Sequence, residues 1–234
     1  MALLLLLLGL LPGFAWLVFY LEEETHAEPK RLILFTFTAG IAFAFFTVII
    51  ERWFNNAMGS ANIGEFSFIS LLGLALIEEV MKFAAADFAI SKTPEMRDPL
   101  DVMIYMIVAA LGFATLENIG AIAGVLPGIG TQTGGQAALI ANLFQTISLR
   151  FAGATLLHSL TSGIVGYHWA KGIARKKVPQ NLAIGFFFAM LLHAIFNFLI
   201  LNSGNIVYVV VFLGIVGFFV LNDFEELKVA EATA

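Results

Sequence analysis

The sequence contains no cysteine and few charged residues. Because none of its 234 residues is a cysteine, disulfides, thiolate-bound metals and a cysteine nucleophile are all excluded. Charged residues make up 12% of the chain, with no basic stripe interleaved with aromatic residues, so we do not expect nucleic acid as a partner. The motifs HExxH, GxSxG and GxGD are also absent, which argues against the familiar hydrolases that carry them.

Apolar residues, by contrast, are abundant. They make up 60% of the chain, and the mean hydropathy is +0.92, whereas an ordinary globular chain is about half apolar. A transmembrane helix needs roughly 20 consecutive apolar residues, so membrane helices fill this length and leave no room for a soluble domain. We therefore expect one all-α domain over residues 1–234, a polytopic helix bundle in the lipid bilayer of the cell membrane.

Seven apolar runs have about the length that a bilayer requires. They lie at about residues 2–20, 32–50, 66–90, 102–126, 151–170, 182–201 and 205–222. Polar connections separate them. The sequence therefore predicts a multi-pass protein with about seven transmembrane helices.

The distribution of lysine and arginine predicts the orientation. If the loops after the first, third and fifth helices and the C-terminal tail face the cytoplasm, that side holds nine of the twelve basic residues. The other side holds only Arg52 and Arg150, and Lys82 lies within a helix. Because basic residues favour the cytoplasmic side, we expect the N-terminus outside and the C-terminus in the cytoplasm.

The predicted outer segment 127–150 is too long for a tight turn. It combines the glycine-rich strings PGIG and TGGQ with the apolar string AALIANLFQTISL. We expect an interfacial helix lying on the membrane. A lid that covers a functional site is the alternative.

Several polar residues lie inside the predicted membrane helices. An ionisable side chain at the bilayer centre costs roughly 2.5 to 3.5 kcal/mol on insertion scales, so those that occur usually face the bundle interior. At about 1.5 Å of rise per residue, Glu78 and Glu79 lie roughly 18 to 20 Å below the outer surface, and Glu117, His158 and His193 roughly 10 to 14 Å below it. One polar site in the outer half to the middle of the membrane could therefore hold them all. The residues are Glu78, Glu79, Lys82, Glu117, Asn118, His158, His193 and Asn197.

Their spacing favours a functional site over separate structural contacts. Lys82 is four residues after Glu78 and three after Glu79, so all three lie on one side of a helix. His193 and Asn197 are four apart and share a face. A single buried histidine or asparagine usually makes only an interhelical hydrogen bond. Adjacent glutamates, however, diverge by about 100° on a helix and would need two separate structural partners.

Carboxylates, imidazoles and an amide, with no arrangement for a serine or cysteine nucleophile, suit the activation of water. We expect Glu78 or Glu79 to be the general base, because a carboxylate taken out of water is a stronger base. His193 and Asn197 would then donate hydrogen bonds to the oxyanion that forms when water adds to an amide carbonyl.

The remaining polar residues have expected supporting roles. Glu117 and His158 would orient water or a neighbouring group, Lys82 would hold a nearby carboxylate ionised, and Asn118 would support the site. No cofactor or metal ligand is expected on this mechanism. Zinc is the alternative, in which Glu117, His158 and His193 become its ligands.

These motifs resemble those of the PrsW family of intramembrane proteases. The resemblance lies in EEVMKF from Glu78, LEN from Leu116, His158, and HAIFN from His193. A wider group of glutamate-dependent membrane proteases, which includes the CAAX prenyl endopeptidases, commonly has a Phe-x-x-x-His string. Here Phe151 is too far from His158 for that string, which favours the PrsW branch. The resemblance implies an endopeptidase that cuts single-pass membrane-anchored proteins, such as anti-sigma factors, from the outer side.

Two other functions remain open from the residues alone. A proton- or ion-coupled transporter could use buried glutamate, lysine and histidine as a relay, although no inverted repeat is visible. A non-catalytic seven-helix scaffold subunit could also retain buried histidines. The adjacent glutamates favour the enzyme.

Overall fold

The structure is a computed structural model that describes residues 2–23, 28–91, 93, 98–125, 135–203 and 205–232. Within these ranges the chain forms eight α-helices and one π-helical stretch, without a strand. The helices are α1 (Ala2–Glu22), α2 (Lys30–Ser60), α3 (Phe68–Ile90), α4 (Pro99–Val125), α5 (Gly135–Leu149), η2 (Arg150–Thr155, π-helical), α6 (Leu156–Ala174), α7 (Val178–Asn202) and α8 (Ile206–Ala232). The predicted all-α membrane bundle is confirmed.

Four of the described helices, α2, α4, α7 and α8, are long and apolar enough to cross a membrane, and α1 contains a shorter apolar helix, Leu6–Glu22. Helix α3 contains four charged residues, and α6 contains several serine, threonine, histidine and glycine residues. The seven predicted spans correspond to α1, α2, α3, α4, α6, α7 and α8. How many of them cross the bilayer, and which side each loop faces, stay predictions.

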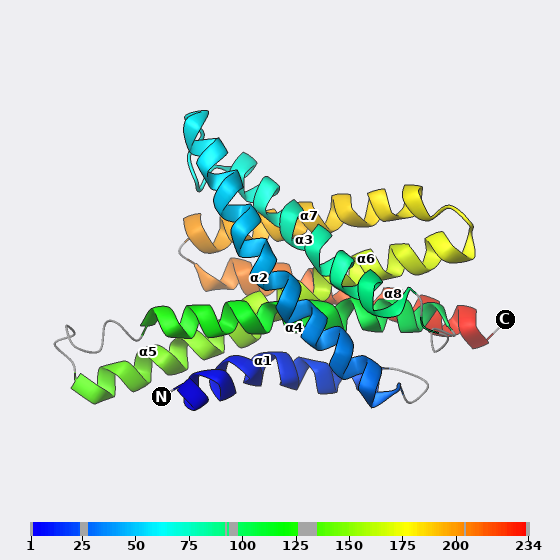
Figure 1. Cartoon of the computed structure of the whole chain (residues 1–234), viewed down its shortest axis with the longest axis horizontal. Helices are drawn as coiled ribbons and strands as arrows, with labels where there is room; N and C mark the ends of the chain where they lie inside the picture. Colours follow the sequence, from blue (N-terminus) through cyan, green and yellow to red (C-terminus); the bar gives the residue numbers. More distant parts are fainter. Residues whose placement is uncertain are drawn as a thin grey trace.

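Helix α4 lies at the centre of the bundle. It runs along the long axis of the molecule in Figure 1, and it packs against α1, α2, α3 and α6. Of its most apolar stretch 89% is buried, against 22 to 33% for α2, α7 and α8. Because neighbouring helices cover most of α4, it is the element against which α1, α2, α3 and α6 are positioned.

Two glycines allow α2 to cross α4 at close range. A Cβ atom on Gly40 would lie 2.0 Å from the carbonyl oxygen of Ala109, and one on Gly112 would lie 2.0 Å from that of Phe37. Small residues let helix backbones approach closely inside a membrane. The steep crossing of α2 over α4 in Figure 1 therefore depends on both glycines.

Helix α2 continues about ten residues beyond its predicted end. The connection expected to begin at residue 51 is helical to Ser60, because no proline and no glycine before Gly59 interrupts it. The extension also packs against α3, since a Cβ atom on Gly73 would lie 2.1 Å from the ring of Phe54. Because α2 extends to Ser60, Glu51 is part of the helix bundle rather than of a connection.

The predicted outer segment 127–150 is mostly helical. Residues 126–134 lie outside the described ranges, whereas α5 covers the rest and continues through η2 directly into α6. Ile140 and Phe144 on α5 are 66 and 73% exposed. The segment is therefore an extension of α6, and its position relative to the membrane surface stays a prediction.

Candidate active site

Three charged side chains of α3 form the centre of a buried polar cluster. Glu79 and Lys82 are fully buried, and Glu78 is 8% exposed. Lys82 Nζ lies 2.8 Å from Glu79 Oε1 and 3.6 Å from Glu78 Oε2. The spacing of three and four residues places these groups on one side of the helix. Lys82 therefore partly balances the charge of both carboxylates.

Glu79 is held by donors from three helices. Its hydrogen bonds come from Lys82 Nζ at 2.8 Å, His193 Nδ1 at 2.8 Å, Thr161 Oγ1 at 2.9 Å and Ser162 Oγ at 3.3 Å. Buried polar groups are normally satisfied in this way. Glu79 thus ties α3 to α6 and α7, and Glu78 is the glutamate of the pair that is left free for chemistry.

The ring of His158 on α6 lies between a carboxylate and an ammonium group. His158 Nε2 is 2.8 Å from Glu117 Oε2, and because an ionised carboxylate only accepts, Nε2 carries the proton. Nδ1 is then an acceptor and receives a hydrogen bond from Lys82 Nζ at 2.7 Å. These two contacts fix the orientation of the ring, with Nδ1 toward α3.

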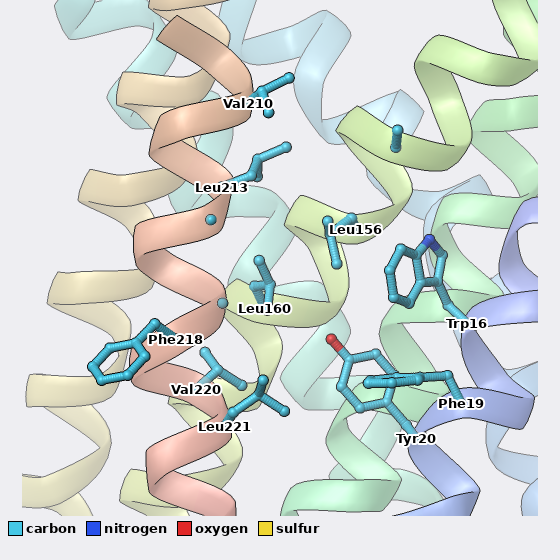
Figure 2. A pocket seen from close by; sticks show the side chains of 13 residues that line it. Trp16, Phe19, Tyr20, Leu156, Leu160, Val210, Leu213, Phe218, Val220 and Leu221 are labelled. Carbon is cyan, nitrogen blue, oxygen red and sulfur yellow. The ribbon is translucent and has the colours of Figure 1, made fainter. Parts of the chain in front are cut away.

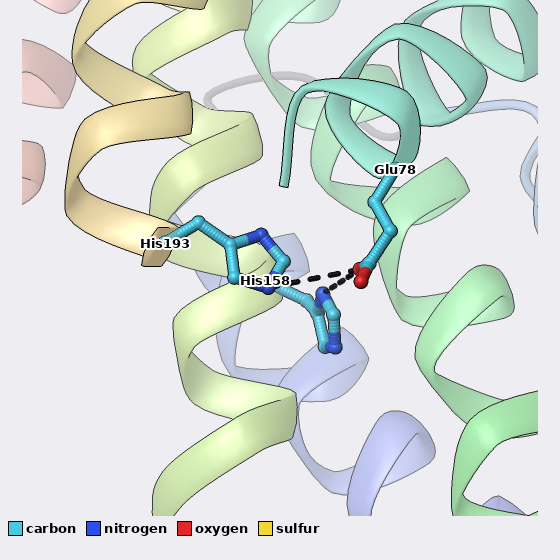
Figure 3. A group of neighbouring side chains, drawn as sticks. All are labelled: Glu78, His158 and His193. Carbon is cyan, nitrogen blue, oxygen red and sulfur yellow. Dashed lines mark ion pairs between the residues drawn. The ribbon is translucent and has the colours of Figure 1, made fainter. Parts of the chain in front are cut away.

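Glu78 Oε2 faces both imidazoles, as Figure 3 shows, at 3.7 Å from His158 Nδ1 and 3.7 Å from His193 Nε2. His193 Nδ1 donates to Glu79, so His193 Nε2 is also an acceptor. Within the described part of the chain, Glu78 Oε2 is buried without a hydrogen-bond partner. Three acceptor atoms from α3, α6 and α7 therefore converge on one point.

These three acceptors fit a metal ion. The ligand atoms of Glu78, His158 and His193 lie within 4.8 Å of one another, and zinc binds nitrogen and oxygen at about 2.0 to 2.2 Å, often with three protein ligands and one open position. Each imidazole also donates its outer N–H to a carboxylate, the usual arrangement around metal-binding histidines. An ion at this point would take over the Nδ1 lone pair that Lys82 occupies.

The other predicted site residues lie around this centre. Glu117 is 30% exposed at its side chain and also accepts from Arg150 Nη2 at 2.9 Å. Asn118 is buried and bonds Thr155 Oγ1 at 3.1 Å, so it braces α4 against η2 rather than facing the centre. Asn197 is half-buried one turn after His193, and its amide has no hydrogen bond to the residues that the structure describes.

Sequence reasoning missed four residues near the centre. Thr161 and Ser162 lie three and four positions after His158, and this helical spacing was a usable signal. The apolar pattern predicts a connection at Glu51, and it identifies Arg150 only as an outer basic residue. Neither of the last two carries a local sequence signal.

A cavity of about 380 Å³ between α2 and α4 reaches the polar cluster. Its lining includes Glu51, Phe113 and Glu117. The Phe113 ring lies 5.2 Å from Lys82 Nζ, so this residue lies between the cavity and the centre. Glu51 forms no hydrogen bond or ion pair within the described ranges. The cavity therefore forms a mostly apolar route to the polar cluster, and the unpaired carboxylate of Glu51 lies in its wall.

A second cavity, of about 530 Å³, lies between α1, α6 and α8 (Figure 2). It is lined by apolar side chains such as Trp16, together with Tyr20. Leu156 and Leu160 also line it, and both are two residues from His158, which places them on the opposite side of α6. This cavity is separate from the polar centre.

Comparison with known proteins agrees with this geometry. Residues 28–221 match a family described as PrsW family intramembrane metalloprotease. A protein of Geobacillus kaustophilus named Protease PrsW is 30% identical over 195 residues, which is 82% of this chain and 78% of the relative. A Bacillus subtilis protein of the same name is 26% identical, covering 86% of this chain and 84% of the relative. No solved structure matches the chain significantly.

Proposed function

The chain belongs to the PrsW family of intramembrane metalloproteases and is a multi-pass membrane protease, and on this premise we propose that Glu78, His158 and His193 form its hydrolytic centre. The observation that carries the proposal is the convergence of Glu78 Oε2, His158 Nδ1 and His193 Nε2, with 3.7 Å between the carboxylate oxygen and each nitrogen. Lys82 Nζ, 2.7 Å from His158 Nδ1 and 3.6 Å from Glu78 Oε2, offsets part of the repulsion among these three acceptors, and a metal ion or a shared proton between them would remove the rest.

The same three side chains would hold the metal ion that the family description implies. An ion bound there supplies a Lewis acid that polarises a carbonyl group and lowers the pKa of water. Glu79 and Glu117 keep the protons on the outer nitrogens of the two imidazoles, so that the inner nitrogens stay available as ligands. We propose that Asn197, one turn after His193, donates a hydrogen bond to the oxyanion.

The metal-free mechanism expected from the sequence uses the same centre. There Glu78 Oε2 accepts the proton of an attacking water, and its lack of a hydrogen-bond partner among the described residues supports that role. The two mechanisms differ in whether an ion is required. We favour the ion, because a carboxylate with two imidazole acceptors is a usual zinc-binding set.

The proposed substrates are membrane-anchored proteins, including single-pass proteins such as the anti-sigma factors that the family resemblance implies. Access from the bilayer is proposed through the cavity between α2 and α4. Phe113 and Glu117 line that cavity and also contact Lys82 and His158 of the centre. A polypeptide segment in the cavity would therefore lie one side chain away from the hydrolytic groups.

The alternatives of a transporter and a non-catalytic scaffold are weakened by the relatives, which carry the name protease. The test is cleavage of a panel of single-pass substrates by the purified protein in detergent. We expect cleavage that a chelator stops and zinc restores, and that His158→Ala and His193→Ala abolish. His168→Ala is the matched control, because this histidine is on α6 but stacks on Phe188. Cleavage that the chelator leaves unchanged would refute the metal mechanism and leave the glutamate one.

A further inference from the structure

Arg150, the first residue of η2, is linked to the hydrolytic centre indirectly, through the carboxylate of Glu117. Its Nη2 atom lies 2.9 Å from Glu117 Oε2, and its Nε atom lies 2.5 Å from Asn118 Oδ1. The same Glu117 oxygen receives His158 Nε2 at 2.8 Å. A continuous chain of hydrogen bonds therefore runs from Arg150 through Glu117 to an imidazole of the centre.

The π-helical stretch makes this alignment possible. Arg150 and His158 are eight residues apart, and in an uninterrupted α-helix their side chains would point about 80° apart at 100° per residue. A π-helical turn bonds residue i to i+5, so each residue advances the chain by a smaller angle. Arg150 and His158 thereby reach the same atom of Glu117. Such turns occur often at functional sites.

Other contacts hold η2 in place. The carbonyl oxygen of Phe151 accepts a hydrogen bond from Trp16 Nε1 on α1 at 2.9 Å, and the two rings stack at 5.3 Å. Thr155 bonds Asn118 of α4 at 3.1 Å. The stretch is thus anchored at both ends to neighbouring helices, and Arg150 projects from a fixed backbone.

Glu117 depends on Arg150 for a single orientation. Its side chain is 30% exposed and lines the cavity between α2 and α4, so it could otherwise turn away from His158. Arginine stays charged under all conditions and offers several donors in a rigid plane. Arg150 uses two of them on adjacent residues of α4, which fixes the carboxylate where His158 needs it.

We propose that Arg150 is a positioning residue of the hydrolytic centre, which holds Glu117 so that Glu117 in turn fixes the ring of His158 with Nδ1 toward Glu78. The proposal rests on the proposed function, because it takes His158 as part of that centre. Arg150 does not line the cavity between α2 and α4. We therefore expect its loss to affect turnover more than the binding of substrate.

The test compares Arg150→Met, Arg150→Lys and Arg52→Met on a substrate that the wild-type protein cleaves. Arg52 is the matched control, because it is an exposed arginine near the end of α2. Loss of a residue that orients a ligand typically costs 10- to 100-fold. We expect Arg150→Met to lower kcat by about that factor, with a smaller change in KM. Arg150→Lys should recover part of the loss, because its ammonium keeps a positive charge for Glu117 but lacks the rigid planar fork of the guanidinium, and Arg52→Met should match the wild type.

Zinc affinity of the purified proteins, measured by competition with a chelating dye, gives a second readout without substrate. Arg150→Met should bind zinc about 10- to 100-fold more weakly than wild type, with the same thermal unfolding temperature. An unchanged kcat, or a loss that merely follows a lower unfolding temperature and that lysine does not relieve, overturns the proposal. If wild-type protein binds no zinc but the kcat effect appears, the metal assignment fails while the role of Arg150 stands.

Discussion

Replacing Glu79 by glutamine is expected to destabilise the fold, whereas the same change at Glu78 is not. Glu79 is fully buried and accepts from Lys82 Nζ and His193 Nδ1, each at 2.8 Å. Breaking a buried ion pair by removing one partner costs about 3 to 5 kcal/mol, because the other charge stays buried. Glu78 Oε2 has no hydrogen bond within the described residues and lies 3.6 Å from Lys82, so its loss should cost less than about 1 kcal/mol.

Thermal unfolding in detergent, followed by tryptophan fluorescence, measures the difference. At roughly 2 to 4 °C per kcal/mol for a chain of this size, Glu79→Gln should unfold about 6 to 20 °C below the wild type, and Glu78→Gln within a few degrees of it. Adding Lys82→Met to Glu79→Gln should restore part of the loss, since neither charge of the Glu79–Lys82 pair is then left without its partner. Equal unfolding temperatures for the two glutamine variants would show that the assignment of a structural and a reactive glutamate is wrong.

Three further predictions address topology, turnover and packing. Single cysteines at Lys176 and Asn62 should label from opposite sides of the membrane, with Lys176 cytoplasmic; labelling from one side contradicts the orientation. Asn197→Ala should slow cleavage by about 10²- to 10³-fold if its amide donates to the oxyanion, and an unchanged kcat excludes that role. Gly112→Ala should lower the unfolding temperature, because its Cβ atom would lie 2.0 Å from the carbonyl oxygen of Phe37; a wild-type unfolding temperature would contradict the close crossing of α2 and α4.

Much of the fold was predictable from the length of the apolar runs alone. A span such as 182–201 has one solution in a bilayer, since a helix satisfies its own backbone. Where a predicted helix boundary is wrong, the reason is local. The polar residues after Ile50 predict a connection, but with no proline and no glycine before Gly59 the segment stays helical, and Phe54 packs it against α3. The π-helical turn at Arg150 has no composition signal, so the continuity of α5 with α6 was not predictable.

The candidate site was predictable in its members but not in their roles. Because ionisable side chains are costly inside a membrane, Glu78, Glu79, His158 and His193 could be identified as one group from the sequence. Spacing could not distinguish the two glutamates, because both are within a turn of Lys82. Their difference arises from α6 and α7, which offer Glu79 several donors and offer Glu78 only acceptors. Such information belongs to tertiary packing and is absent from any one helix.

The most direct test of the proposed centre is the cleavage rate of Glu78→Gln on a verified membrane-anchored substrate. Glutamine keeps the shape of the side chain and removes its charge and basicity, so both the metal-bound and the metal-free mechanism lose the group on which they depend. The predicted result is a folded, membrane-inserted protein whose cleavage falls by at least about 10³-fold. Cleavage at the wild-type rate by that variant would contradict the assignment of Glu78, and with it the centre formed with His158 and His193.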